Sequence, residues 1–175
     1  IAQELDGAIF EFWQSIFLPA ILAGFADPDD NVKRNAAFCC GVCCESLGDR
    51  IVGEYPAILQ ALSPLFTVDP TQGDSSAACI DNAAAAVSRM IMASPNHVPL
   101  GQVLPVLLQS LPLKTDMTEN ETVYTCLLGL LQMNQPDLVA NSVELKRILV
   151  DATSDTSKVA DEIKEKLRLA AQSMS

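Results

Sequence analysis

The densest group of chemically reactive side chains in this chain is a run of cysteines. Four of the six cysteines belong to it: Cys39, Cys40, Cys43 and Cys44. A zinc site needs four ligands that converge in a tetrahedron. On a helix, Cys39 and Cys43 share one face, but Cys39 and Cys40 point about 100° apart. The remaining cysteines, Cys79 and Cys126, are isolated in the sequence. We therefore expect no metal site, and we expect the small thiol side chains to pack a close contact between helices.

Catalytic chemistry has few candidate residues. His97 is the only histidine, and it lies between Pro95 and Pro99 in a segment typical of a turn. A catalytic triad needs a base beside its nucleophile, and a single loop histidine is more often simply exposed. No glycine-rich phosphate loop of either common spacing is present. We expect the chain to be no enzyme and to bind no cofactor.

Polar pairs recur where helices rich in small residues are expected to begin. These pairs are Arg34-Asn35, Asp81-Asn82 and, more loosely, Glu121-Thr122. In stacked helices such positions form a polar ladder. Its asparagine amides could bond to a peptide backbone, and its carboxylates could attract lysine or arginine. The candidate binding residues are Asn35, Phe38, Asp81, Asn82, Glu119, Glu121 and Tyr124.

A structural interpretation of the same residues stays open. Asparagine and aspartate near a helix start are often caps or local hydrogen-bond partners. Phe38 and Tyr124 lie one turn further along each helix. They fit a helical core as well as they fit the wall of a site for a lysine stem.

The elements that would position these residues repeat a two-part pattern. Each repeat opens with an apolar stretch that contains a proline, at Pro19, Pro56 and Pro105. The polar pair follows 16 to 26 residues later. Periods of about 40 to 47 residues with two helices each are typical of HEAT-type solenoids. We expect an all-α fold, a single α-solenoid over residues 1–175 with about three and a half to four helical hairpins. The expected units are about 8–48, 53–93, 99–133 and 136–172.

Local signals predict several helix ends. The first helix, at about 8–26, should bend at Pro19. Asp29 or Asp30 should cap the next helix, which should end near Gly48, and Ser75 should cap a helix at 75–93. The last helix, at 156–172, has one apolar and one charged face. A polar outer face is typical of a terminal repeat, so we expect the C-terminal end of a longer solenoid.

Charge narrows the class of partner. The chain has 22 acidic and 11 basic residues among 175, a formal net charge of -11. Such a field disfavours nucleic acid and anionic membrane and favours basic partners. No secretory signal or membrane-spanning stretch is visible. For a chain with six cysteines and no such signal, we expect a reducing compartment, the cytosol or the nucleus.

Several segments resemble the karyopherins of the importin-beta superfamily. Three stretches carry the resemblance, in the order and spacing of the C-terminal repeats of histone-importing members: Val32-Lys33-Arg34-Asn35-Ala36-Ala37-Phe38 with Gly41-Val42 and Glu45; Asp81-Asn82-Ala83-Ala84 continuing to Arg89-Met90-Ile91; and Glu119-Asn120-Glu121-Thr122-Val123-Tyr124. The resemblance covers about residues 10–150. The cysteine run departs from the family pattern.

The resemblance implies a fragment of a nuclear import receptor in the cytoplasm and nucleus. Its acidic concave surface would bind basic cargo, such as the histone H3 tail, histone H4 or ribosomal proteins. The Ran-GTPase would be bound by N-terminal repeats that this chain lacks. By position, Asn82, Glu119 and Glu121 are the implied cargo contacts, and the polar ladder adds Asn35. We expect a monomer.

Two other functions remain open from the sequence. The chain could be a structural scaffold segment of another HEAT protein, with partners at its ridge loops or convex side. It could instead only complete and cap a superhelix whose cargo binds elsewhere.

Overall fold

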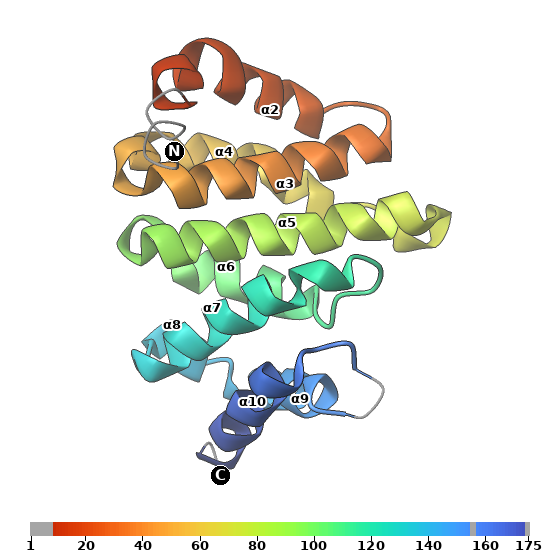
Figure 1. Ribbon diagram of the computed structural model, residues 1–175, viewed down its shortest axis with the longest axis vertical. Coiled ribbons are helices and arrows are strands. Elements are labelled where there is room, and N and C mark those ends of the chain that lie inside the picture. Colours follow the sequence, from red (N-terminus) through yellow and green to blue (C-terminus); the bar gives the residue numbers. More distant parts are fainter. Residues whose placement is uncertain (1–8, 155–156, 174–175) are drawn as a thin grey trace.

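The computed structural model describes residues 9–154 and 157–173, and all regular structure within these residues is helical. Figure 1 shows the helices stacked along the long axis in two rows. The first row contains α2 (Leu18–Phe25), α4 (Tyr55–Leu62), α6 (Leu100–Gln109), α8 (Pro136–Val139) and α9 (Ser142–Ala152). The second row contains α3 (Asp30–Leu47), α5 (Asp74–Ala93), α7 (Asn120–Gln132) and α10 (Asp161–Ser173). The predicted all-α, HEAT-type solenoid is confirmed.

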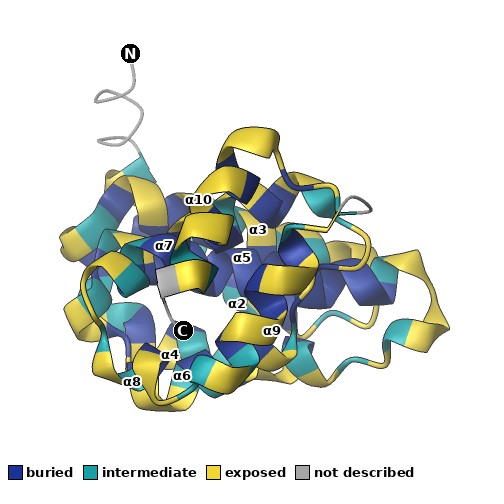
Figure 2. Cartoon of the chain, turned by 90° about the horizontal axis from the view of Figure 1, so that it is seen from below, coloured by how far each residue is buried: buried dark blue, intermediate teal, exposed yellow. Residues whose placement is uncertain are grey.

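Contacts run mainly from one repeat to the next, as a solenoid requires. In the second row, α3 packs against α5, α5 against α7, and α7 against α10. In the first row, α6 packs against α8 and α9. The centre of the stack is α5, in which every residue from Ser76 to Ile91 is buried. Figure 2 shows this helix dark blue between its neighbours.

Small residues let neighbouring helices approach closely, both within the second row and between α2 and α3. An added Cβ at Gly41 of α3 would lie 2.8 Å from the Cα of Ala86 on α5. At Gly24 of α2, it would lie 2.6 Å from the Cβ of Ala36. Cβ atoms do not approach this closely, so only glycine fits at either position. The alanine-rich sequence of α5 serves the same close packing, with Ala83, Ala84 and Ala86 fully buried.

The proline-containing stretches fold in three different ways. A π-helical turn, Trp13–Phe17, precedes Pro19, which lies in the first turn of α2. The wider turn accommodates a residue that has no N–H and whose ring crowds the preceding turn. Pro56 lies in the first turn of α4, where its missing N–H costs nothing, and only Pro105 lies inside its helix. At Pro19, where we expected a bend, the chain changes from a π-helical turn to an α-helix. The expected start of this helix, residue 8, lies outside the described residues.

The capping predictions are partly correct. Asp29 caps α3 by accepting a hydrogen bond from the Asn31 N–H at 2.8 Å, and α3 ends at Gly48, whose φ is 52°. Ser75 is not a cap, because α5 begins one residue earlier, after Gly73. The Ser75 hydroxyl instead donates to the side-chain oxygen of Asn31 at 2.9 Å and so links α5 to α3.

The last helix is shorter than predicted. It begins at Asp161, whereas the sequence pattern predicted a helix from 156, a residue outside the described part. Residues 157–160 form a connection before it. The Lys164 ammonium folds back and donates to the Ser157 carbonyl at 3.0 Å. This contact satisfies a loop carbonyl and holds the connection against α10.

Candidate functional site

A charged cluster joins the three central second-row helices around Arg89 of α5. Its guanidinium lies 2.8 Å from the carboxylate of Glu119 and 3.3 Å from that of Glu45. It also donates to the Thr122 hydroxyl at 3.2 Å, and its Cζ lies 5.5 Å from the centre of the Phe38 ring. We call these five residues the Arg89 cluster. It spans α3, α5 and the start of α7, so one side chain connects three repeats.

Burial decides what each member of the Arg89 cluster can do. Arg89 is 8% exposed and Glu119 is 4% exposed, so this ion pair is largely removed from water. The Glu45 side chain is 59% exposed and Phe38 is 46% exposed. Charge attraction across the buried pair is strong because water screens it weakly. Glu119 therefore serves the internal pair, whereas Glu45 and Phe38 present their side chains to solvent.

The Asp81-Asn82 pair positions the loop that leads to α7. The Asp81 carboxylate is fully buried and accepts backbone N–H bonds from Lys114 at 3.1 Å, Thr115 at 2.7 Å and Asp116 at 2.8 Å. Asn82 donates to the Ala78 carbonyl at 2.9 Å and to the Asp116 carboxylate at 3.0 Å. The surrounding contacts hold the pKa of Asp116 below its ordinary value; its burial opposes this, whereas hydrogen bonds from Thr118 and Asn82 favour the charged form.

The predicted polar ladder divides by burial. Asn35, Phe38 and Glu121 are exposed on the second row. Asp81, Asn82 and Glu119 are buried and bonded within the chain, so the structural interpretation of these three fits their placement. Tyr124 is 1% exposed and packs in the core, which was one of its two interpretations from the sequence. Of the candidate residues and the Arg89 cluster, those with exposed side chains are Asn35, Phe38, Glu45 and Glu121.

Sequence reasoning did not select three members of the cluster as candidate binding residues: Glu45, Arg89 and Thr122, the last of which appeared only in a polar pair. Arg89 could have been found, because it is the only basic residue of an otherwise small and apolar α5. A charge in that setting needs a partner on a neighbouring helix. Glu45 gives no such signal, since an exposed glutamate late in a helix is ordinary.

The cysteines lie at the contact between α3 and its neighbours. Cys40, Cys43 and Cys44 are buried in the core, and Cys39 is half-buried. A hydrogen bond from Cys43 lowers the pKa of Cys39 to about 7, whereas the contact with Cys44 and burial raise the pKa of Cys40. Within residues 9–154 and 157–173, no three histidine, cysteine or acidic side chains converge as metal ligands would.

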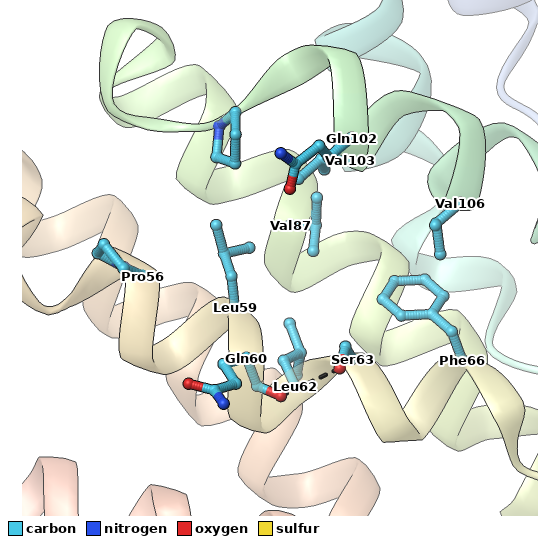
Figure 3. Close-up of a pocket in the computed structure, with 11 residues that line it drawn as sticks. Pro56, Leu59, Gln60, Leu62, Ser63, Phe66, Val87, Gln102, Val103 and Val106 are labelled. Atoms are coloured by element: carbon cyan, nitrogen blue, oxygen red, sulfur yellow. Dashed lines mark hydrogen bonds between the residues drawn. The ribbon is translucent and has the colours of Figure 1, made fainter.

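An apolar pocket of about 400 Å³ opens on the first row, between α4 and α6. Figure 3 shows Leu59 and Phe66 on one side and Val103 and Val106 on the other. Leu59 was predicted to face the core, and it is half-buried because it lines this pocket. No charged residue lines the pocket, so it differs in chemistry from the second row.

The described helices are all too short or too polar to cross a membrane. The fold defines a class: a segment of an all-α solenoid of HEAT type. No family model matches the chain.

Sequence comparison places the solenoid in a family. The chain is 32% identical over 168 residues to a probable importin subunit beta-4 of Schizosaccharomyces pombe, which covers 95% of this chain. It is 35% identical over 147 residues to importin-4 of Homo sapiens and to importin-4 of Mus musculus, which cover 83% of it. The chain spans only 13 to 15% of the length of these relatives. It belongs to the importin-beta family, as a segment of such a protein.

Proposed function

We propose that the chain is part of a nuclear import receptor and that its second-row helices bind a basic segment of the cargo. The relatives carry the name importin, which supports a transport role in the cytoplasm and nucleus rather than an enzymatic one. Histone H3 and H4 tails and ribosomal proteins are the cargo classes that the family resemblance suggests. The proposal concerns this segment only. In the whole protein, repeats outside it would also contact the cargo.

The observation that carries the proposal is the pair of exposed carboxylates on α3 and α7, the two second-row helices that pack against α5. Glu45 projects from α3 and Glu121 from α7, on either side of the buried Arg89. Arg89 pairs with Glu119. Within the described residues, Glu121 forms no ion pair, so its carboxylate can attract a basic ligand. A basic segment laid across α3, α5 and α7 would place lysines near both carboxylates. The net charge of -11 would speed the encounter.

Two further exposed side chains of α3 suit an extended peptide. The Phe38 ring offers an apolar surface for the aliphatic stem of a lysine. Asn35 lies one turn before Phe38 and is exposed, so its amide can donate to and accept from a peptide backbone.

A titration with a charge-matched control tests the proposal. A fluorescent peptide of the histone H3 tail is titrated into the chain at low and at physiological salt. The double variant Glu45→Lys/Glu121→Lys is compared with Glu11→Lys/Glu144→Lys. The control makes the same change of net charge outside the second row, at the exposed Glu11 and the half-buried Glu144. We expect the first variant to weaken binding by on the order of tenfold more than the control.

Equal losses in the two variants would mean that only net charge matters, and would refute a site on the second row. Absence of binding to the folded, unaltered chain at low salt would refute cargo binding by this segment. That result would favour the scaffold or capping role.

A further inference from the structure

A second pocket, more polar than the first, lies between the start of α7 and the segment that joins α9 to α10. Its volume is about 350 Å³. Ser157, Lys158 and Val159 line it from the described part of the connection between α9 and α10. Asn120 and Tyr124 line it from α7, and Asp151 lines it from α9. Met117, Leu113 and Val159 supply apolar walls.

The buried polar groups of this pocket lack strong partners. Asn120 is 5% exposed, and its only side-chain contact in the described residues is a weak one, 3.6 Å from its amide nitrogen to the Met117 sulfur. Tyr124 is 1% exposed, and its hydroxyl makes no hydrogen bond within the described residues. Neither the Asn120 amide nor the Tyr124 hydroxyl is among the fully enclosed polar atoms that lack a partner. Both groups line the pocket, so a ligand in it can bond to them.

The available groups at this pocket are mostly acceptors. They are the amide oxygen of Asn120, the phenolic oxygen of Tyr124 and the second carboxylate oxygen of Asp151, whose Oδ2 accepts from Arg147 at 2.8 Å. A ligand that satisfies three acceptors needs several N–H donors and a positive charge. Apolar walls beside these acceptors suit an aliphatic stem. Lysine and arginine side chains have both properties.

We propose that this pocket takes one lysine or arginine side chain from a basic protein segment. The inference rests on the proposed function for its source of basic segments, and it adds a contact one repeat beyond the Arg89 cluster. The ammonium or guanidinium group would donate to Asp151, Asn120 and Tyr124, and the stem would lie against Met117.

A lysine of the chain itself is the first competitor for this pocket. Lys158 lies at the rim, but its side chain is exposed rather than inserted. Asp151 already shares its charge with Arg147. Both features weaken the attraction for an external lysine, so we expect a millimolar Kd for a single side chain, about 4 kcal/mol of binding free energy.

The methionine methyl groups provide a direct test. The chain has five methionines, of which Met117 lines the pocket and Met92 lies on α5, one turn beyond Arg89. The full chain labelled with ¹³C at its methionine methyls is titrated with the capped tripeptide Gly-Lys-Gly and with its acetyl-lysine form. We expect the Met117 signal to move with the lysine peptide and to stay in place with the acetylated one.

Variants separate the pocket from general charge effects. Asp151→Asn should raise the Kd by on the order of tenfold, and Tyr124→Phe, which keeps the ring, by about threefold. Glu144→Gln is the matched control, because it removes the other carboxylate bound to Arg147 without lining the pocket. It should leave the Kd unchanged.

The outcomes also distinguish this inference from the proposed function. An unmoved Met117 signal, or equal responses to both peptides, would refute the lysine pocket. Equal effects of Asp151→Asn and Glu144→Gln would refute it too. If Met117 responds while Glu45→Lys/Glu121→Lys leaves the binding of the long peptide intact, the pocket stands and the second-row site fails.

Discussion

The guanidinium of Arg89 on α5 lies 2.8 Å from the carboxylate of Glu119 at the start of α7, and both side chains are buried. This pair connects two repeats through their second helices. It also removes Glu119 from the set of carboxylates that a ligand could reach. Among the carboxylates near this pair, Glu45 and Glu121 stay exposed.

Removing the arginine should strongly destabilise the fold. In Arg89→Met, Glu119 keeps a buried charge without its partner, which costs about 3–5 kcal/mol of the free energy of unfolding. Urea denaturation measures the loss. The control Lys166→Met breaks an exposed pair with Glu162 and should cost less than about 1 kcal/mol. Similar losses in the two variants would show that the Arg89 pair adds nothing special.

Neutralising Asp81 should loosen the loop before α7. Asp81→Asn weakens charge-assisted bonds to three backbone N–H groups, at a cost of about 1.5–3 kcal/mol. Hydrogen exchange should show faster exchange at the Thr115 and Asp116 amides. Asp69→Asn alters a similar cap in an exposed turn, and it should leave these two amides unaffected. Unchanged exchange in Asp81→Asn would contradict the anchoring role.

Adding one methyl group at Gly41 should separate α3 from α5. Gly41→Ala places a Cβ 2.8 Å from the Ala86 Cα, and overpacking of this kind costs about 1–3 kcal/mol. Gly129→Ala in α7 meets no atom within 4 Å, and it should instead stabilise the helix by about 0.5–1 kcal/mol. Thermal unfolding should move in opposite directions for the two variants. A shift of the same sign would contradict the close contact.

The two tyrosines should titrate late in the folded chain. Burial raises the pKa of Tyr124 to about 12, and burial also raises the pKa of Tyr55. The pKa of an unfolded tyrosine is about 10, so the pKa in the folded chain is the higher of the two. The resulting stability is present below pH of about 10 and is lost as pH rises from there to about 12. The absorbance of tyrosinate, followed against pH, should give a raised titration midpoint in the native chain and an ordinary midpoint in urea. The same midpoint in both would contradict the burial of the two hydroxyls.

Much of the fold follows from local pattern, and some of it does not. The repeated apolar stretches and the Asp29 cap are local signals, and each is confirmed. The π-helical turn before Pro19 is not a local signal of the same kind, because a proline can be accommodated by a bend, a break or a wider turn. The burial of Trp13 on the core side fixes which of these occurs.

The site was harder to predict because equivalent positions in the repeats have different surroundings. Asn35 and Asn82 occupy matching places near the starts of α3 and α5, yet Asn35 is exposed and Asn82 is 3% exposed. The loop before α7 folds over α5 and takes the Asn82 amide as a partner. Such contacts join residues more than thirty positions apart, and their register depends on how the repeats stack.

The most direct test of cargo binding by the second row combines a change in the ligand with a change in the chain. A lysine-rich peptide and its acetylated form are each titrated into the unaltered chain and into Glu45→Lys/Glu121→Lys. Acetylation removes the positive charge that these carboxylates attract. We predict that acetylation weakens binding to the unaltered chain by on the order of tenfold and has little effect on the variant. An equal acetylation effect on both would contradict a site formed by Glu45 and Glu121.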